Sequence, residues 1–114
     1  MTVQELRNHL KESVEIKEKT FEHFNLKLSN IGFSSFDDDD GWFNVILEVE
    51  SLNEESLQSA VYLKANFYDS DNNILATGST LITEDFSGFD TFSLVMQEDN
   101  LAFEINKIIL YVGV

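Results

Sequence analysis

The stretch from Ser59 to Gly78, SAVYLKANFYDSDNNILATG, limits the possible folds of this chain more than any other part of it. Apolar side chains occupy every second position from Val61 to Phe67, and a second apolar run begins at Ile74. Successive side chains of a strand point to opposite faces, so this alternation indicates a strand with one buried face. The Asp and Asn residues between the two runs favour a tight turn. The sequence therefore predicts a β-hairpin.

Most of the chain after residue 24 follows the same alternation. Further strands are predicted near residues 24–29, 42–51, 91–96 and 105–112, and the last of these is an unbroken apolar run, which we expect to be covered on both sides. The segments IGFSSFDDDDG, TEDFSGFD and QEDNLAFE between them are expected to be loops. The pattern predicts a mainly β fold, an immunoglobulin-like antiparallel β-sandwich of about six or seven strands over residues 24–112. A small barrel is the alternative.

The N-terminus predicts a short helix. Thr2 and Glu5 have the spacing of a capping box, and Val3, Leu6 and Leu10 follow at helical intervals, which predicts a helix over residues 3–12. The period changes at Ser13, which suggests a strand near residues 13–20, with a helix continuing to about residue 24 as the alternative. At 114 residues, the whole chain (1–114) is expected to form a single domain.

The charge is unevenly distributed. Residues 1–27 contain five acids and five bases, whereas residues 28–114 contain the other 16 acids and only Lys64 and Lys107, so the net charge of −14 lies entirely on the predicted β region. Such a surface disfavours nucleic acid and anionic membranes, which are bound by clustered Lys and Arg. A basic protein partner or a divalent cation is compatible with it. A purely solubilising surface is the alternative.

Composition gives an expectation about the compartment. The chain has no cysteine, and so no disulfide or thiolate chemistry, which fits a cytoplasmic protein. No apolar run is long enough to cross a bilayer, and the N-terminus lacks the apolar core of a signal peptide. An exported parent whose signal has been removed is the alternative.

The segment FYDSDNNILATG resembles FxLYD-type and related late-embryogenesis-like bacterial β-sandwich modules. Phe67, Tyr68 and Asp69 match the strongest motif of these modules, and FNVILEVES, FSGFDTFSLVM and KIILYV are similar to other strands of the pattern, over about residues 26–112. The chain departs from the pattern at Asn72 and Asn73, where Gly is usual, and in its N-terminal helix. The resemblance implies a β-sandwich, and it implies a non-catalytic accessory domain of a surface or secreted protein.

The loop FSSFDDDDGW is a candidate interaction tip, because it places aromatic side chains beside four adjacent carboxylates. The alternatives are a solvated acidic loop and aromatic side chains that fill the core. The candidate binding residues are Phe36, Asp37, Asp38, Asp39, Asp40 and Trp42.

A second acidic turn is a candidate calcium site. Asp69, Asp71 and Asn73 have the spacing of the first half of an EF-hand loop, but Ile74 and Thr80 stand where that loop requires Gly and Glu. Oxygen ligands from another loop, such as Glu84 and Asp85, would have to complete a site. The alternative is that these Asp and Asn side chains only form the turn.

No nucleophile, metal-binding or phosphate-binding motif of a known enzyme class is present, so the chain is not expected to be an enzyme or to need a cofactor other than a possible Ca²⁺. The charge favours a non-catalytic module that binds a basic protein partner. The alternatives are a calcium-binding β-sandwich and an acidic inhibitor or immunity protein that imitates the charge of nucleic acid. The sequence gives no oligomeric state.

Overall fold

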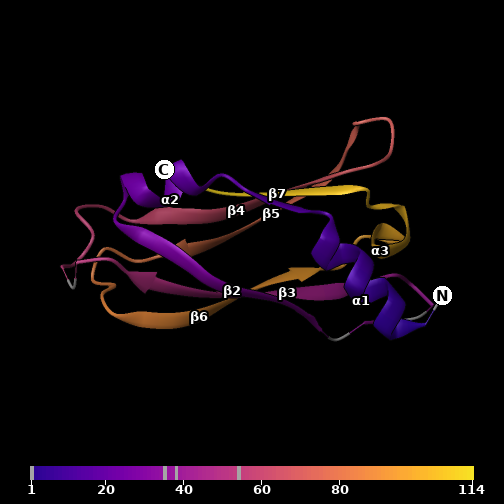
Figure 1. Cartoon of the computed structure of the whole chain (residues 1–114), viewed down its shortest axis with the longest axis horizontal. Helices are drawn as coiled ribbons and strands as arrows, with labels where there is room; N and C mark the ends of the chain where they lie inside the picture. Colours follow the sequence, from indigo (N-terminus) through magenta and orange to yellow (C-terminus); the bar gives the residue numbers. More distant parts are fainter. Residues whose placement is uncertain (1, 35, 38, 54) are drawn as a thin grey trace.

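A computed structural model describes residues 2–34, 36–37, 39–53 and 55–114 of the chain (Figure 1). The described elements are α1 (Val3–Glu12), β1 (Val14–Ile16), α2 (Glu18–His23), β2 (Leu26–Ser34), β3 (Phe43–Ser51), β4 (Val61–Tyr68), β5 (Ile74–Ile82), β6 (Phe89–Met96), α3 (Leu101–Glu104) and β7 (Lys107–Gly113).

The strands form two sheets, which confirms the prediction of a mainly β, two-sheet arrangement with a short N-terminal helix. One sheet has the order β1-β7-β4-β5 and the other β2-β3-β6. All pairs are antiparallel except β1 with β7, which is parallel, so the prediction of an entirely antiparallel sandwich is wrong at that pair. The pair is parallel because β1 leads from α1 to α2, and β7 starts after α3, at the end of the molecule where α1 lies, so both strands run toward α2 (Figure 1).

The predicted hairpin is confirmed as β4 and β5, with Val61 opposite Ile82 and Tyr68 opposite Ile74. The side chains of β4 alternate between buried and more exposed positions along the whole strand, as the sequence indicates. The buried face packs between the sheets, where Phe67 and Phe43 meet edge to face with ring centroids 5.9 Å apart. This apolar core draws side chains from both sheets and from α1, α2 and α3.

The N-terminal helix is confirmed over residues 3–12, and both hydrogen bonds of the Thr2 and Glu5 capping box are present. The strand expected near residues 13–20 is shorter, because β1 ends at Ile16 and α2 begins at Glu18. Both interpretations of this segment are therefore correct over part of it. The buried side chain of Phe21 holds α2 against the core.

Three other expectations need correction. Strand β2 begins at Leu26 and continues to Ser34, through residues expected to be a loop, because buried Phe33 extends its inward face. The segment QEDNLAFE contains helix α3, which buries Leu101 and Ala102. Strand β7 buries every second side chain only, so its unbroken apolar sequence does not mark full burial on both faces.

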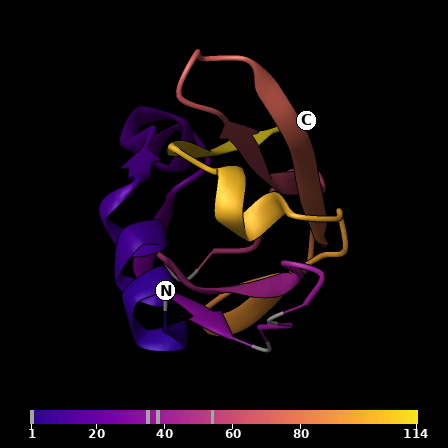
Figure 2. The same ribbon diagram turned by 90° about the vertical axis from the view of Figure 1, so that its right-hand side faces the viewer.

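The connections divide between two ends of the molecule, at the right and left of Figure 1, and Figure 2 looks onto the right-hand end. We call them the α3 end and the α2 end. The α3 end contains the β2–β3, β4–β5 and β6–β7 connections, and hydrogen bonds from Ala102 N–H to Gly41 O and from Asn106 N–H to Tyr68 O join them. The α2 end contains the β3–β4 and β5–β6 connections. None of the helices in the described ranges has the length and apolar character needed to span a membrane.

Candidate interaction site

Two loops that are far apart in the sequence meet at the α3 end. Asn100 N–H donates to Asp40 O at 2.6 Å, and Ala102 N–H donates to Gly41 O at 3.1 Å. Gly41 has a φ of +73°, and a Cβ at this position would lie 2.9 Å from the Cα of Asn100. Only glycine fits this close approach of two backbones. The acidic β2–β3 turn is therefore fixed against the β6–β7 connection.

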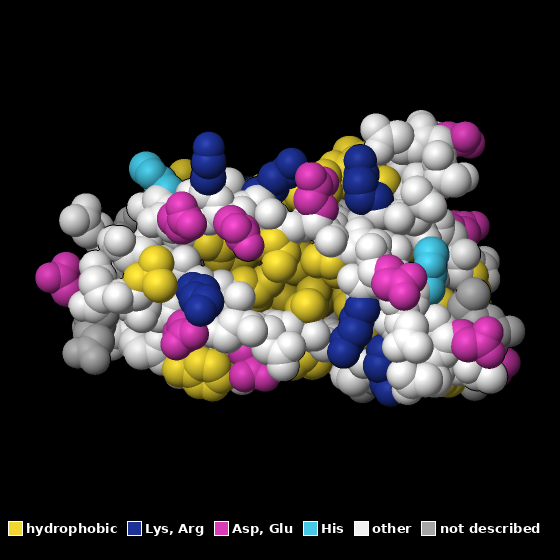
Figure 3. Space-filling view, in the orientation of Figure 1, with side chains coloured by type: hydrophobic (Ala, Val, Ile, Leu, Met, Phe, Trp, Pro, Cys, Tyr) yellow, Lys and Arg dark blue, Asp and Glu magenta, His cyan; other side chains and the backbone are white. Residues whose placement is uncertain are grey.

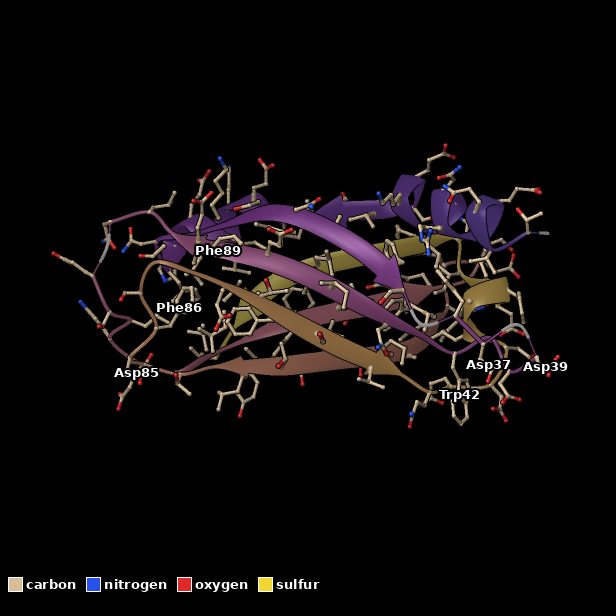
Figure 4. All side chains as sticks on the ribbon, turned by 90° about the horizontal axis from the view of Figure 1, so that it is seen from below. Asp37, Asp39, Trp42, Asp85, Phe86 and Phe89 are labelled. Carbon is tan, nitrogen blue, oxygen red and sulfur yellow. The ribbon has the colours of Figure 1, made fainter. Side chains whose placement is uncertain are left out.

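Asp37 builds the turn itself. Its Oδ1 accepts the backbone N–H groups of Asp39 at 2.9 Å and Asp40 at 3.1 Å, and its carbonyl accepts the N–H of Gly41 at 2.9 Å. A short side-chain acceptor at the first position of a turn stabilises it in this way. Asp39 and Asp40 themselves are exposed, and Figure 4 shows Asp39 at the outer end of the turn. The predicted site residue Asp38 lies outside the described residues.

Asp99, which was not among the predicted site residues, also belongs to this group. Its Oδ1 accepts the indole N–H of Trp42 at 3.1 Å. Asp99 stands in the segment QEDNLAFE, which was expected to be a loop, and no local pattern indicates that it meets residues of the β2–β3 turn. The contact depends on the pairing of β3 with β6, which sets Phe43 opposite Met96 and so brings their flanking loops together.

The acids at this end are crowded together. Desolvation raises the pKa of Asp40 above its ordinary value, and repulsion from Asp37, Asp99 and Asp39 raises it further. Within the described ranges, the only ion pair joins Lys17 and Glu15, at 3.3 Å, far from this turn in the sequence. The α3 end thus carries closely spaced negative charge with no basic side chain paired to it in the described part of the chain.

The aromatic residues of the predicted tip have different environments. Phe36 is half-buried: its ring stacks on Phe43 with centroids 6.1 Å apart, and the Arg7 guanidinium lies 5.7 Å from its centre. These contacts place Phe36 against the core. Trp42 is also half-buried, and it lies next to the acidic turn (Figure 4). Trp42 is therefore the aromatic side chain of the tip that remains beside the carboxylates.

The candidate calcium ligands are not brought together. Asp69 Oδ1 accepts the N–H groups of Asp71 and Asn73, each at 2.9 Å, and the Asn73 backbone bond is the main reason that the pKa of Asp69 is lowered. Asp69 therefore forms the turn. Glu84 and Asp85 follow the far end of the same hairpin, beyond Ile82, so they belong to the α2 end. No group of three possible metal ligands converges anywhere in the described ranges.

An apolar hollow lies on the face shown in Figure 3, between the two sheets. Ile16, Phe21, Leu26, Leu28 and Leu52 line it, and its volume is about 220 Å³. Glu18 and Glu22 stand at its rim, and both are exposed. Two carboxylates can act as general acid and general base when their environments differ. Glu18 and Glu22 lie on the same exposed surface of α2, so their environments do not differ in this way.

Comparison with known proteins finds no family model that matches the chain and no curated protein similar to it.

Proposed function

We propose that this chain is a non-catalytic protein-interaction module whose α3 end binds a partner with a basic surface. The observation that carries this proposal is the group of Asp37, Asp39, Asp40 and Asp99, which two separate loops hold in one place. Desolvation raises the pKa of Asp40, and repulsion from the other members of the group raises it further. A basic partner would relieve this repulsion, and long-range attraction would speed the encounter.

Trp42 gives the acidic group an apolar component. Its ring is half-buried and its indole N–H is held by Asp99, so the side chain is fixed before a partner arrives. Tryptophan is enriched among the residues that dominate binding energy at interfaces, and a fixed side chain loses little entropy on binding. The negative charge would then set the rate at which the partner associates, and contact with Trp42 would lengthen the lifetime of the complex.

The test is affinity capture from lysate with two variants of equal charge. Asp39→Asn, Asp40→Asn and Asp99→Asn remove three negative charges from the acidic group of the α3 end, whereas Glu18→Gln, Glu22→Gln and Glu55→Gln remove the same charge from exposed positions outside it. At about 50 mM salt, the unmodified chain and the second variant should capture the same basic protein, and the first variant should lose it. Equal loss of capture in both variants would mean that only the net charge of the chain matters. Equal capture by the unmodified chain and both variants would contradict the proposal.

We also infer that the two-sheet arrangement is immunoglobulin-like. In favour of this, β2, β3 and β6 pair in the order of strands A, B and E of that fold, and β5, β4 and β7 pair in the order of C′, C and F. β1 then occupies the place of strand G, but it runs parallel to its neighbour. An experimental structure tests this inference by the direction and partner of β1.

A further inference from the structure

The two sheets have four edge strands, and these differ in how their free backbone groups are protected. β1 and β5 are the edges of one sheet, and β2 and β6 are the edges of the other. An edge strand presents unpaired N–H and C=O groups that can pair with another chain. Proteins block such edges with short strands, charged side chains, proline or irregular pairing.

Three of the edges carry such a device. β1 is only three residues long. On β2, the Arg7 side chain from α1 donates to the carbonyl of Phe33 at 3.1 Å. On β6, the side chain of Asp90 accepts the N–H of Thr91 at 2.8 Å and places a carboxylate on the strand. A further strand could pair with only three residues on β1, and it would have to displace the Arg7 side chain on β2 or the Asp90 side chain on β6.

The fourth edge, β5, is open. Its nine residues, ILATGSTLI, include no charged residue and no proline. Its irregular pairing is confined to its start, and Ala76–Ile82 follow β4 in regular register. Within the described ranges, the backbone of this stretch forms hydrogen bonds only with β4. Thr77 and Ser79 are exposed, and Figure 2 shows β5 running along one side of the molecule below the β4–β5 turn.

The uncharged edge has acidic residues beyond each of its ends. Asp69 and Asp71 precede β5 in the β4–β5 turn, and Glu84 and Asp85 follow it. A strand of this length spans about 30 Å. Asp71, Glu84 and Asp85 are exposed. The edge therefore matches a strand with an uncharged middle and basic residues at both ends.

An aromatic hollow adjoins the α2 end of β5. Leu81, Phe86, Phe89 and Phe92 line it together with Asp85, and Figure 4 shows Asp85, Phe86 and Phe89 at this end. Phe89 leaves 56% of its surface exposed. Aromatic rings beside a carboxylate suit the apolar stem and charged head of an Arg or Lys side chain.

We propose that the β5 edge binds an extended segment of a partner protein as an added strand, with an uncharged middle and basic residues at both ends. Backbone hydrogen bonds to β5 supply affinity, and the acids at the two ends with the hollow at Phe89 select the basic residues. This inference rests on the proposed function, because it names the structural form of the basic partner. It adds a surface separate from the acidic group around Asp40.

The experiment uses the full chain and two peptides of equal length and charge. The peptide RRTVTVTVTRR can form a strand, whereas RRTVPPPVTRR cannot continue a ladder through its prolines. The first should bind at least about tenfold more tightly by fluorescence anisotropy and should slow amide hydrogen exchange within Ala76–Ile82. Equal binding of both peptides would overturn the edge proposal while leaving a charge-driven basic partner intact. Binding of neither would overturn it too, with the capture experiment still deciding the proposed function.

Variants locate the added strand. Thr77→Lys with Ser79→Lys should abolish binding of RRTVTVTVTRR, whereas Ser93→Lys with Val95→Lys makes the same charge change on β6 and should leave most of it. The reverse result would place the strand on β6 and overturn the assignment. Phe89→Ser should weaken binding more than Val95→Ser, although the two side chains are 56% and 60% exposed. Dimers of the peptide-free chain that the two β5 lysines abolish would overturn the proposed occupant, because the added strand would then come from a second copy of this chain.

Discussion

The two ends of the sandwich both carry acids, but they hold them differently. At the α3 end, the backbone of Gly41 packs against Asn100, so carboxylates from separate connections share one fixed group. At the α2 end, Asp85 accepts a hydrogen bond from Thr83 within its own turn, and a Cβ on Gly88 would meet nothing within 4 Å. Acid content therefore does not distinguish the ends. Close backbone packing does, because it keeps like charges together against their repulsion.

The two glycines with positive φ test this difference most strongly, because each end has one. Gly41→Ala combines left-handed strain with overlap on Asn100 and should lower the free energy of unfolding by about 3 kcal/mol. Gly88→Ala carries only the strain and should cost about 1 kcal/mol. Urea denaturation followed by circular dichroism measures both. Equal losses would mean that the α3 end is no more tightly packed than the other.

A second, smaller effect separates an acid that builds a turn from an acid that does not. The backbone N–H of Asn73 lowers the pKa of Asp69 below 3.8, so the charged form stabilises the fold above that pH. Asp69→Asn should lower the melting temperature at pH 7, and the loss should shrink as the pH falls from 3.8 through the lowered pKa. Asp71→Asn makes the same charge change in the same turn and serves as the control. An equal loss in both variants would assign the effect to net charge.

Asp40 should show the opposite sign. The pKa of Asp40 in the folded protein is raised above its ordinary value of 3.8. Between pH 3.8 and this raised pKa, the folded state binds more protons than the unfolded state, so the free energy of unfolding falls as the pH rises through this range. Asp40→Asn should raise the melting temperature at pH 7, and the gain should vanish below pH 3.8. Asp85→Asn, at the α2 end, should give no such gain. A gain of the same size there would remove the distinction between the two ends.

The sequence predicts the fold well where periodicity carries the information. The capping box locates α1, and the alternation from Val61 locates β4 and its turn. It predicts residues 13–24 only in part, as either a strand or a helix, because a strand of three residues followed by a helix of six leaves no extended period that would show both. It also misses α3, whose helical form depends on the burial of Leu101 and Ala102 against the core.

The site is predicted only in part. The four adjacent Asp residues and Trp42 can be selected from the sequence alone, because only Gly41 separates them. Asp99 cannot, because its place beside Trp42 depends on the pairing of β3 with β6 across the sheet. The candidate calcium set fails for the related reason that Asp69 and Asp85 belong to opposite ends of one hairpin. Spacing in the sequence predicts neighbours within a turn, but distance between turns depends on strand length.

The smallest expected effect concerns calcium, which would bind at one end if either built a cation site. A site filled at 100 times its dissociation constant would add about 2.7 kcal/mol to the free energy of unfolding. The described carboxylates offer no such site, so equal millimolar CaCl₂ and MgCl₂ should raise the melting temperature by the same small amount, through screening alone. A larger shift with Ca²⁺, reversed by a chelator, would contradict this. Loss of that shift in Asp71→Asn or in Asp85→Asn would then identify the end that binds the ion.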